Sequence, residues 1–248
     1  MPDKRRHRGQ HPEDARLFAE DQLQALRISV AEYSWLLTRG YAQESAVKLV
    51  GDRHALTARQ RVALMRSACS DQALKRRSEK LTTLTQSRGG AIGIDGYNLL
   101  ITIESALSDG VVLVGRDGCY RDLASIHGTY RKVEETIPAV RLIADYLSGF
   151  GIAQVDWYLD RPVSNSGRLK ALMAKTLTER ESKEDTGTIW SIELANSPDA
   201  VLADYAGPVV TSDSVVLDRC ATWINLGAEI IEARIPDART IHLGADRA

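Results

Sequence analysis

The sequence predicts an α/β domain with a central, mostly parallel sheet in the second half of the chain, preceded by a small all-α unit. From residue 91 onward, short continuous apolar runs alternate with amphipathic helical stretches. Such continuous runs are typical of parallel strands that are covered by helices on both faces. Before residue 88, apolar residues recur at helical spacing instead. We therefore expect a disordered basic tail over 1–12, a helical domain over 13–88 and an α/β domain over 89–248.

The helical domain is predicted to contain several short helices. Helical spacing of apolar residues runs through 13–39, and a shorter helix is expected over 44–50. Thr57 and Gln60 have the spacing of a capping box, which opens a further helix toward Leu74. The short connectors between these segments favour helices packed as antiparallel hairpins.

The α/β domain is predicted from the order of its apolar runs. Strands are expected at 91–94, 111–114, 153–159, 189–194 and 208–211, and the apolar patches at 223–226 and 240–243 are expected to close the sheet. Helices are expected at 99–107, 136–150, 164–177 and 199–205.

Charge is distributed unevenly along the 248 residues. The net charge is -1, but residues 1–90 hold 17 Lys and Arg against 10 Asp and Glu, which leaves 15 against 23 in the remainder. A basic first half and an acidic second half fit a polyanion binder joined to a carboxylate-rich site. Two ordinary solvated surfaces that differ in sign would give the same numbers.

Several classes of protein are disfavoured by the sequence. Its three cysteines, Cys69, Cys119 and Cys220, are far apart and lie near no histidine at ligand spacing, so neither a zinc site nor a disulfide framework is expected. The start of the chain lacks the apolar stretch of a secretory signal, and no run of about 18 apolar residues predicts a membrane span. We expect a cytoplasmic protein. The Gly-x-Ser-x-Gly elbow of serine hydrolases and the glycine fingerprint of dinucleotide-binding folds are both absent from the sequence.

Aspartates stand where the predicted strands end. Asp95, Asp160 and Asp213 each end or directly follow an apolar strand, and Asp199 opens the helix before the strand that leads to Asp213. Open parallel sheets bind ligands beyond the carboxyl ends of their strands, so we expect the four side chains to converge there. Carboxylates held together repel one another unless a cation neutralises them, and hard oxygen ligands suit Mg²⁺ or Mn²⁺.

These motifs resemble those of PIN and NYN ribonucleases. Ile94-Asp95-Gly96-Tyr97-Asn98 is similar to their opening strand, and the segment from Asp199 to Thr211-Ser212-Asp213 is similar to their later signature, in which an Asp begins a helix that precedes a strand ending in Thr-x-Asp. Asp160 is similar to the second-strand Asp of NYN proteins. The resemblance implies a PIN-like three-layer domain in which Asp95, Asp160, Asp199 and Asp213 are catalytic metal ligands, and in which Asn98 and Ser212 make supporting hydrogen bonds to a ligand or water.

The sequence departs from the PIN pattern in two ways. The glutamate expected on a helix between the first and the later aspartates has no clear counterpart, and Glu104, Glu134 and Glu135 are the candidates unless Asp160 replaces it. The segment 111–132 is an insertion relative to a minimal domain. Nearly the whole chain also resembles an uncharacterised prokaryotic family that joins a helical domain to a PIN-like domain, and this second resemblance implies no activity.

Further residues are candidates for substrate contacts. Ser164, Asn165 and Ser166 precede a predicted helix and could hold a phosphate at its N-terminus, although N-capping explains them equally well. Arg131 and Lys132, with His127 and Tyr130, could flank the site or form an ordinary surface loop. A set of basic residues in the helical domain could bind nucleic acid or simply solvate helix faces: Arg53, Arg59, Lys75, Arg76 and Arg77.

Two functions follow as hypotheses. The first is a ribonuclease that uses Mg²⁺ or Mn²⁺ to hydrolyse RNA at the aspartate cluster. The second is a non-catalytic RNA- or nucleotide-binding module on the same scaffold, because a fold does not fix a function. A phosphatase of the Asp-x-Asp type is disfavoured because Tyr97 stands where the second Asp would be. The sequence leaves open whether the chain forms a homodimer.

Overall fold

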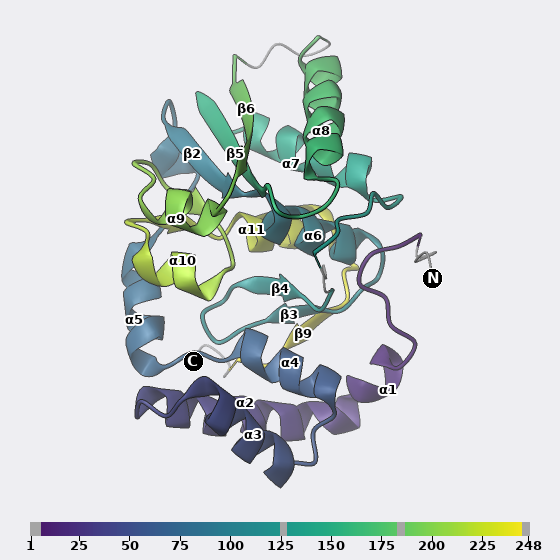
Figure 1. Ribbon diagram of the computed structural model, residues 1–248, viewed down its shortest axis with the longest axis vertical. Helices are drawn as coiled ribbons and strands as arrows, with labels where there is room; N and C mark the ends of the chain where they lie inside the picture. Colours follow the sequence, from purple (N-terminus) through teal and green to yellow (C-terminus); the bar gives the residue numbers. More distant parts are fainter. Residues whose placement is uncertain (1–5, 125–127, 183–186, 245–248) are drawn as a thin grey trace.

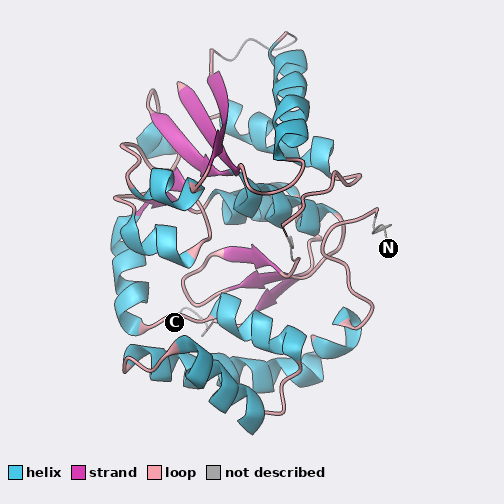
Figure 2. Cartoon of the chain, in the orientation of Figure 1, coloured by secondary structure: helices cyan, strands magenta, loops and turns pink. Residues whose placement is uncertain are grey.

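A six-stranded parallel sheet forms the centre of the computed structural model, which describes residues 6–124, 128–182 and 187–244 (Figures 1 and 2). Its strands lie in the order β1-β8-β7-β2-β5-β6. They are β1 (Leu81–Thr82), β2 (Ala91–Asp95), β5 (Gln154–Asp160), β6 (Ile189–Ala195), β7 (Val209–Val210) and β8 (Trp223–Ile224). The α/β class with a parallel sheet is confirmed.

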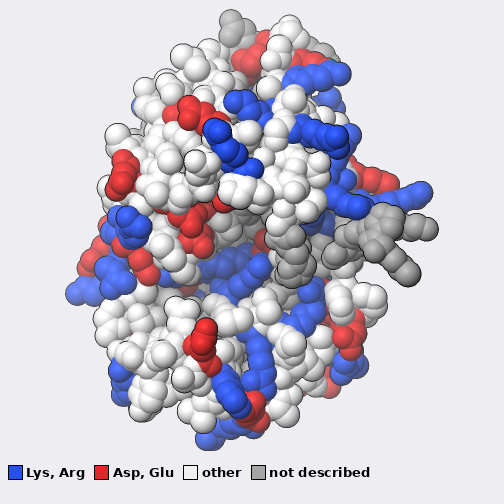
Figure 3. Space-filling view, in the orientation of Figure 1, with Lys and Arg blue, Asp and Glu red and all other residues white. Residues whose placement is uncertain are grey.

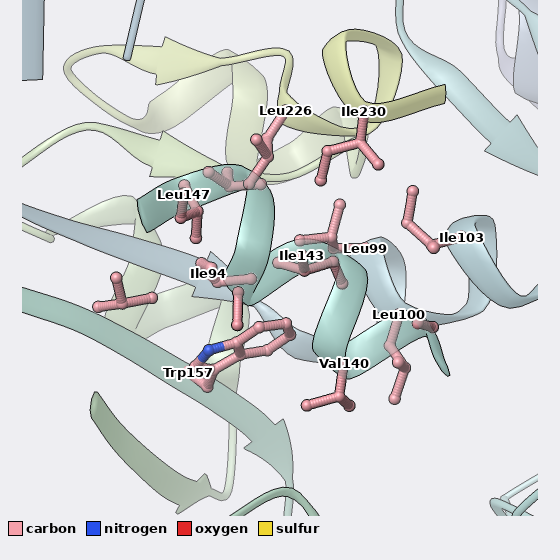
Figure 4. Packing of buried hydrophobic residues seen from close by; sticks show 14 of the residues in the cluster. Ile94, Leu99, Leu100, Ile103, Val140, Ile143, Leu147, Trp157, Leu226 and Ile230 are labelled. Atoms are coloured by element: carbon pink, nitrogen blue, oxygen red, sulfur yellow. The ribbon is translucent and has the colours of Figure 1, made fainter. Parts of the chain in front are cut away.

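Side chains alternate between the two faces of this sheet. In β2, Ile92 and Ile94 enter the main core, whereas Gly93 lies against Tyr205 and Leu202 on the opposite face. The main core is covered by α6 (Gly96–Leu107), α7 (Thr136–Ser148), α8 (Ser166–Glu181) and α11 (Leu226–Arg234), and Figure 4 shows Trp157 of β5 together with buried residues of α6, α7 and α11. The opposite face is covered by the short helices α9 (Pro198–Ala203) and α10 (Ser214–Arg219). The fold therefore has three layers.

A second, smaller sheet has three strands. β3 (Val112–Val114) pairs antiparallel with β4 (Tyr120–Asp122) and parallel with β9 (Thr240–His242). The expectation that residues 111–114 and 240–243 belong to the central sheet is therefore wrong. Leu113 and Ile241 pack against the N-terminal helices instead. These two apolar runs are therefore buried by the helical layer and not by the helices that cover the central sheet.

The helical part of the chain forms a layer beneath the small sheet (Figure 1). Its helices are α1 (Asp14–Leu17), α2 (Glu20–Thr38), α3 (Gln43–Arg53), α4 (Ala58–Ser67) and α5 (Asp71–Lys80), followed by a 3-10 turn (Thr85–Ser87). The capping box of Thr57 and Gln60 is confirmed at the start of α4. Two of the helices predicted from apolar spacing are too long, because the chain breaks between α1 and α2 and again between α4 and α5.

The N-terminal segment differs from the disordered tail that was expected, because residues 6–12 lie against α6 and its neighbours. Arg8 donates from Nε to Oε2 of Glu104 at 2.7 Å, and the Glu104 side chain is fully buried. Tyr130 and Thr136 donate to the other carboxylate oxygen of Glu104. Burial raises the pKa of Glu104, while the charge of Arg8 opposes that rise. Arg8 of this segment therefore neutralises a buried acid, whereas Arg6 and His7 are exposed.

Replacement of Arg8 by methionine is expected to destabilise the fold by about 3–5 kcal/mol, because it leaves the buried Glu104 carboxylate without its counterion. Urea unfolding at pH 7 measures this loss. Arg16→Met is the matched control, because Arg16 forms an exposed ion pair with Glu13 and should cost less than about 1 kcal/mol. Equal stabilities of the two variants would contradict a structural role for the N-terminal segment.

Candidate metal centre

The strand order creates a switch point beside β2. After β2, the chain adds β5 and β6 on one side, and then returns to add β7 and β8 on the other side. At such a point the connections leave the sheet in opposite directions and open a crevice beyond the carboxyl ends of the strands. Here α6 follows β2 on one face and α10 follows β7 on the other. Asp95 and Asp213 stand directly at this crevice.

Asp95 ends β2 and caps α6. One carboxylate oxygen accepts from the backbone N–H of Asn98, and the other accepts from the Asn98 amide and from the Thr211 hydroxyl at 2.9 Å. Gly96 is required next to it, since a Cβ there would lie 2.8 Å from the carbonyl oxygen of Tyr158 in β5. Burial raises the pKa of Asp95 to about 7, against the hydrogen bonds from Asn98 and Thr211, and the charge of Asp213 raises it further. Asn98 is thus bonded to Asp95 itself, and the hydrogen bond predicted from Asn98 to a ligand or water stays a prediction.

Asp213 begins α10 just after β7. Its Oδ1 accepts from the backbone N–H groups of Val215 and Val216, so N-capping accounts for one of its oxygens. Its own backbone N–H donates to the Thr211 hydroxyl, which also holds Asp95. Thr211 therefore fixes both aspartates, a role that the sequence did not reveal. Ser212 contributes its backbone carbonyl, which accepts from Arg121, and the hydrogen bond predicted from Ser212 to a ligand or water stays a prediction.

Asp160 and Asp199 extend the acidic cluster. Burial raises the pKa of Asp160, and the charge of Asp199 raises it further. The pKa of Asp199 is raised by burial and then by the charge of Asp213. Each aspartate thus interacts electrostatically with the next, in the order Asp95, Asp213, Asp199, Asp160. The three aspartates predicted at strand ends and Asp199 at the start of α9 therefore lie at one edge of the sheet.

The cluster suits a divalent cation that keeps part of its water shell. Its donors are all hard carboxylate oxygens, and the pKa values of Asp95, Asp160 and Asp199 are raised by burial first and then by the charge of a neighbouring aspartate. Within the described residues, no group of three or more acidic, histidine or cysteine side chains is arranged to hold a metal ion directly. Mg²⁺ commonly binds through one or two carboxylates and retains several waters, so the residues fit a hydrated ion and not an all-protein cage.

A cleft of about 290 Å³ adjoins this edge of the sheet. One wall comes from α6 and the Ser212–Ser214 turn, and the other comes from α4 through Met65 and Arg66. Figure 3 shows Lys and Arg side chains in the hollow between α4 and α10, with acidic side chains on its upper rim. Cationic and acidic side chains therefore line the same cleft. Sequence reasoning did not predict Arg66 or Arg121 as site residues.

A buried ion network braces the turn that carries Asp213. Asp117 accepts from Arg77 at 2.6 Å and from two nitrogens of Arg121 at 2.8 and 2.9 Å. Arg121 also donates to the carbonyl oxygen of Ser212, and Arg77 to that of Ser214. The two guanidinium groups hold the pKa of Asp117 well below its usual range despite burial. The prediction that Arg77 contacts nucleic acid is wrong, because its side chain is buried within this network.

The other predicted nucleic-acid contacts lie in different surroundings. Arg59 is engaged by both oxygens of Asp14 and is mostly buried, so it is not a free surface cation. Three others are at least partly exposed and are paired with acidic neighbours: Arg53 with Glu32, Lys75 with Glu79 and Arg76 with Asp218.

The candidates for a central glutamate do not reach the crevice. Glu104 is buried against Arg8, and Glu135 accepts from His7 near the N-terminal segment. Glu134 is exposed. Glu104 lies nine residues beyond Asp95 along α6, which separates them by roughly 13 Å of helix axis.

The remaining substrate candidates lie around the start of α8. Asn165 occupies the N-cap position of α8 and adopts a left-handed backbone. Its side-chain amide donates to the Tyr130 carbonyl and makes no hydrogen bond to the N–H groups of the helix. Ser164 is exposed, whereas Ser166 is buried. Arg131 and Lys132 are exposed, Tyr130 is buried against Glu104, and His127 lies outside the described residues.

Comparisons with known proteins identify relatives without a described activity. A family model described as a domain of unknown function (DUF5616) matches residues 84–229, more than half of the chain. A second model, described as a protein of unknown function (DUF434), matches residues 25–80. An uncharacterized protein of Methanocaldococcus jannaschii is 29% identical over 209 residues, which cover 81% of this chain and 94% of that protein. No solved structure matches the chain. In the described part of the chain, no helix has both the length and the apolar character that crossing a membrane requires.

Proposed function

This chain belongs to the family described as a domain of unknown function (DUF5616), and we propose that it is a divalent-metal-dependent ribonuclease with a PIN-like domain. The observation that carries the proposal is the electrostatic coupling of four aspartates at the switch point of a parallel sheet. Holding four ionised carboxylates together without a cation costs folding free energy because they repel one another. This cost supports a site for Mg²⁺ or Mn²⁺.

The residues of the cluster have different roles in this proposal. Asp95, held by Asn98 and Thr211, is the most rigid donor, and Asp199 and Asp160 are more accessible to solvent. A bound divalent cation polarises the scissile phosphate and lowers the pKa of an attacking water. The chain itself supplies the carboxylates that hold the ion and the adjoining cleft that receives the RNA.

The alternative is a non-catalytic RNA- or nucleotide-binding module. Two observations favour it: no described group of three side chains is arranged to ligate a metal directly, and no candidate glutamate reaches the crevice. The two functions differ in whether the aspartates affect cleavage or only binding.

Cleavage of a fluorescent single-stranded RNA in the presence of Mn²⁺ tests the proposal. Asp199→Asn is expected to lower kcat by about 100-fold, because it removes a carboxylate from the cluster. Asp204→Asn is the matched control, since Asp204 is an exposed residue at the other end of α9, and its kcat should stay within about twofold. Wild-type protein that cuts no RNA with either Mn²⁺ or Mg²⁺, or an Asp199→Asn variant as active as wild type, would contradict the proposal.

A further inference from the structure

The cleft beside the carboxylates is built from both family-matched regions of the chain. Tyr97, Asn98 and Asp213 on one wall belong to the region matched by the DUF5616 model. Met65 and Arg66 on the other wall belong to α4, in the region matched by the DUF434 model. The helical region therefore completes the cleft and is not a separate module.

Arg66 is held firmly but retains donors for a ligand. Its Nη1 donates to the backbone carbonyl and to the carboxylate of Asp122, and its Nη2 donates to the carbonyl oxygen of Ala124 at 3.2 Å. A guanidinium group has five N–H donors, and within the described residues Nε has no bond. One third of the side chain is exposed. Arginine fixed in this way is well suited to bind a phosphate.

A second polar group of the cleft lacks a partner. The hydroxyl of Tyr97 is buried, and the structure gives it no hydrogen bond within the described residues. Tyr97 therefore contributes to the wall of the cleft, while its hydroxyl is enclosed by the protein and is not exposed to a ligand in the cleft. Met65 is 46% exposed on the opposite wall and offers an apolar contact surface.

We propose that Arg66 is a substrate-binding residue that holds a backbone phosphate of a polynucleotide strand across the cleft from Asp213. This inference rests on the proposed function for the identity of the ligand. The helical region then takes a direct part in the site. Nucleic acid contacts α4 and not the exposed basic faces of α3 and α5.

Fluorescence anisotropy with a labelled single-stranded RNA oligonucleotide in EDTA tests the inference, because EDTA prevents metal-dependent cleavage. Arg66→Met is expected to weaken binding about tenfold at low salt and to reduce the slope of log K against log salt by about 0.7, the value for one phosphate contact on a single strand. Arg66→Lys should retain most of the slope because it keeps the charge. Arg53→Met is the matched control, since Arg53 is 71% exposed, is also paired with a carboxylate and lies beside the α2–α3 groove.

Each outcome decides one question. A reduced salt slope in Arg66→Met, with the slope of Arg53→Met unchanged, supports the inference. An unchanged slope in Arg66→Met, or a reduced slope in Arg53→Met but not in Arg66→Met, overturns it. Failure of wild-type protein to bind the oligonucleotide also overturns it. The proposed nuclease function is judged separately by the effect of Asp199→Asn on cleavage, so either idea can fail without the other.

Discussion

Asp95→Asn is expected to make the metal-free protein more stable at pH 8 by about 2–4 kcal/mol, although it removes a residue of the proposed site. Burial raises the pKa of Asp95 from 3.8 to about 7, so the folded state favours the neutral carboxyl. The stability that this protonation confers is complete below about pH 4 and is lost as the pH rises through about 7. An asparagine oxygen can still accept from Asn98 and Thr211 without this loss.

Urea unfolding in EDTA at pH 5 and pH 8 measures this effect. The difference between variant and wild type should be about one third of its full value at pH 5, which lies above the ordinary pKa of 3.8, and should reach its full value at pH 8. An Asp95→Asn variant that is less stable than wild type at pH 8 would show that the carboxylate stabilises the fold. It would contradict the view that Asp95 is a functional residue that lowers folding stability.

Asp117→Asn is expected to destabilise the protein by about 3–5 kcal/mol at pH 7, because two buried guanidinium groups lose their shared counterion. The pKa of Asp117 is lowered in the folded state, so its stabilising effect is present above its ordinary value of 3.8 and is lost as the pH falls below it. The substitution should also loosen the turn that carries Asp213, since Arg121 holds the carbonyl oxygen of Ser212.

The matched control for this prediction is Asp71→Asn. Asp71 pairs with Arg116 but is 63% exposed, so its loss should cost less than about 1 kcal/mol. Urea unfolding of both variants at pH 7 provides the comparison. A loss below about 1 kcal/mol for Asp117→Asn would mean that the network is not the brace inferred from its geometry.

The features that sequence reasoning predicted correctly depend on local patterns. Continuous apolar runs identified the strands that carry Asp95 and Asp160, and the spacing of Thr57 and Gln60 identified the start of α4. Because strands of a parallel sheet end at the same edge, the convergence of Asp95, Asp160 and Asp213 followed from their places at strand ends, and that of Asp199 from its place at the start of a helix. These inferences required no knowledge of which strands are neighbours.

The features that were missed depend on partners distant in sequence. Arg77 belongs to a run of basic residues that resembles a solvated helix face, but its partners Asp117 and Asp218 are 40 and 141 positions away. Arg66 faces the cleft only because the small sheet positions α4 beside it. Likewise, the apolar run at 240–243 pairs with β3 and not with the central sheet, a choice between two hydrophobic layers that its composition does not determine.

Calorimetric titration with Mn²⁺ tests the central claim most directly, with wild-type protein, Asp95→Asn and Asp204→Asn compared in one buffer at pH 8. We expect wild type and Asp204→Asn to bind the ion with the same affinity, and Asp95→Asn to lose binding by at least about 100-fold while remaining folded. Absence of Mn²⁺ binding by wild type, or equal binding by Asp95→Asn, would contradict a metal site at the aspartate cluster.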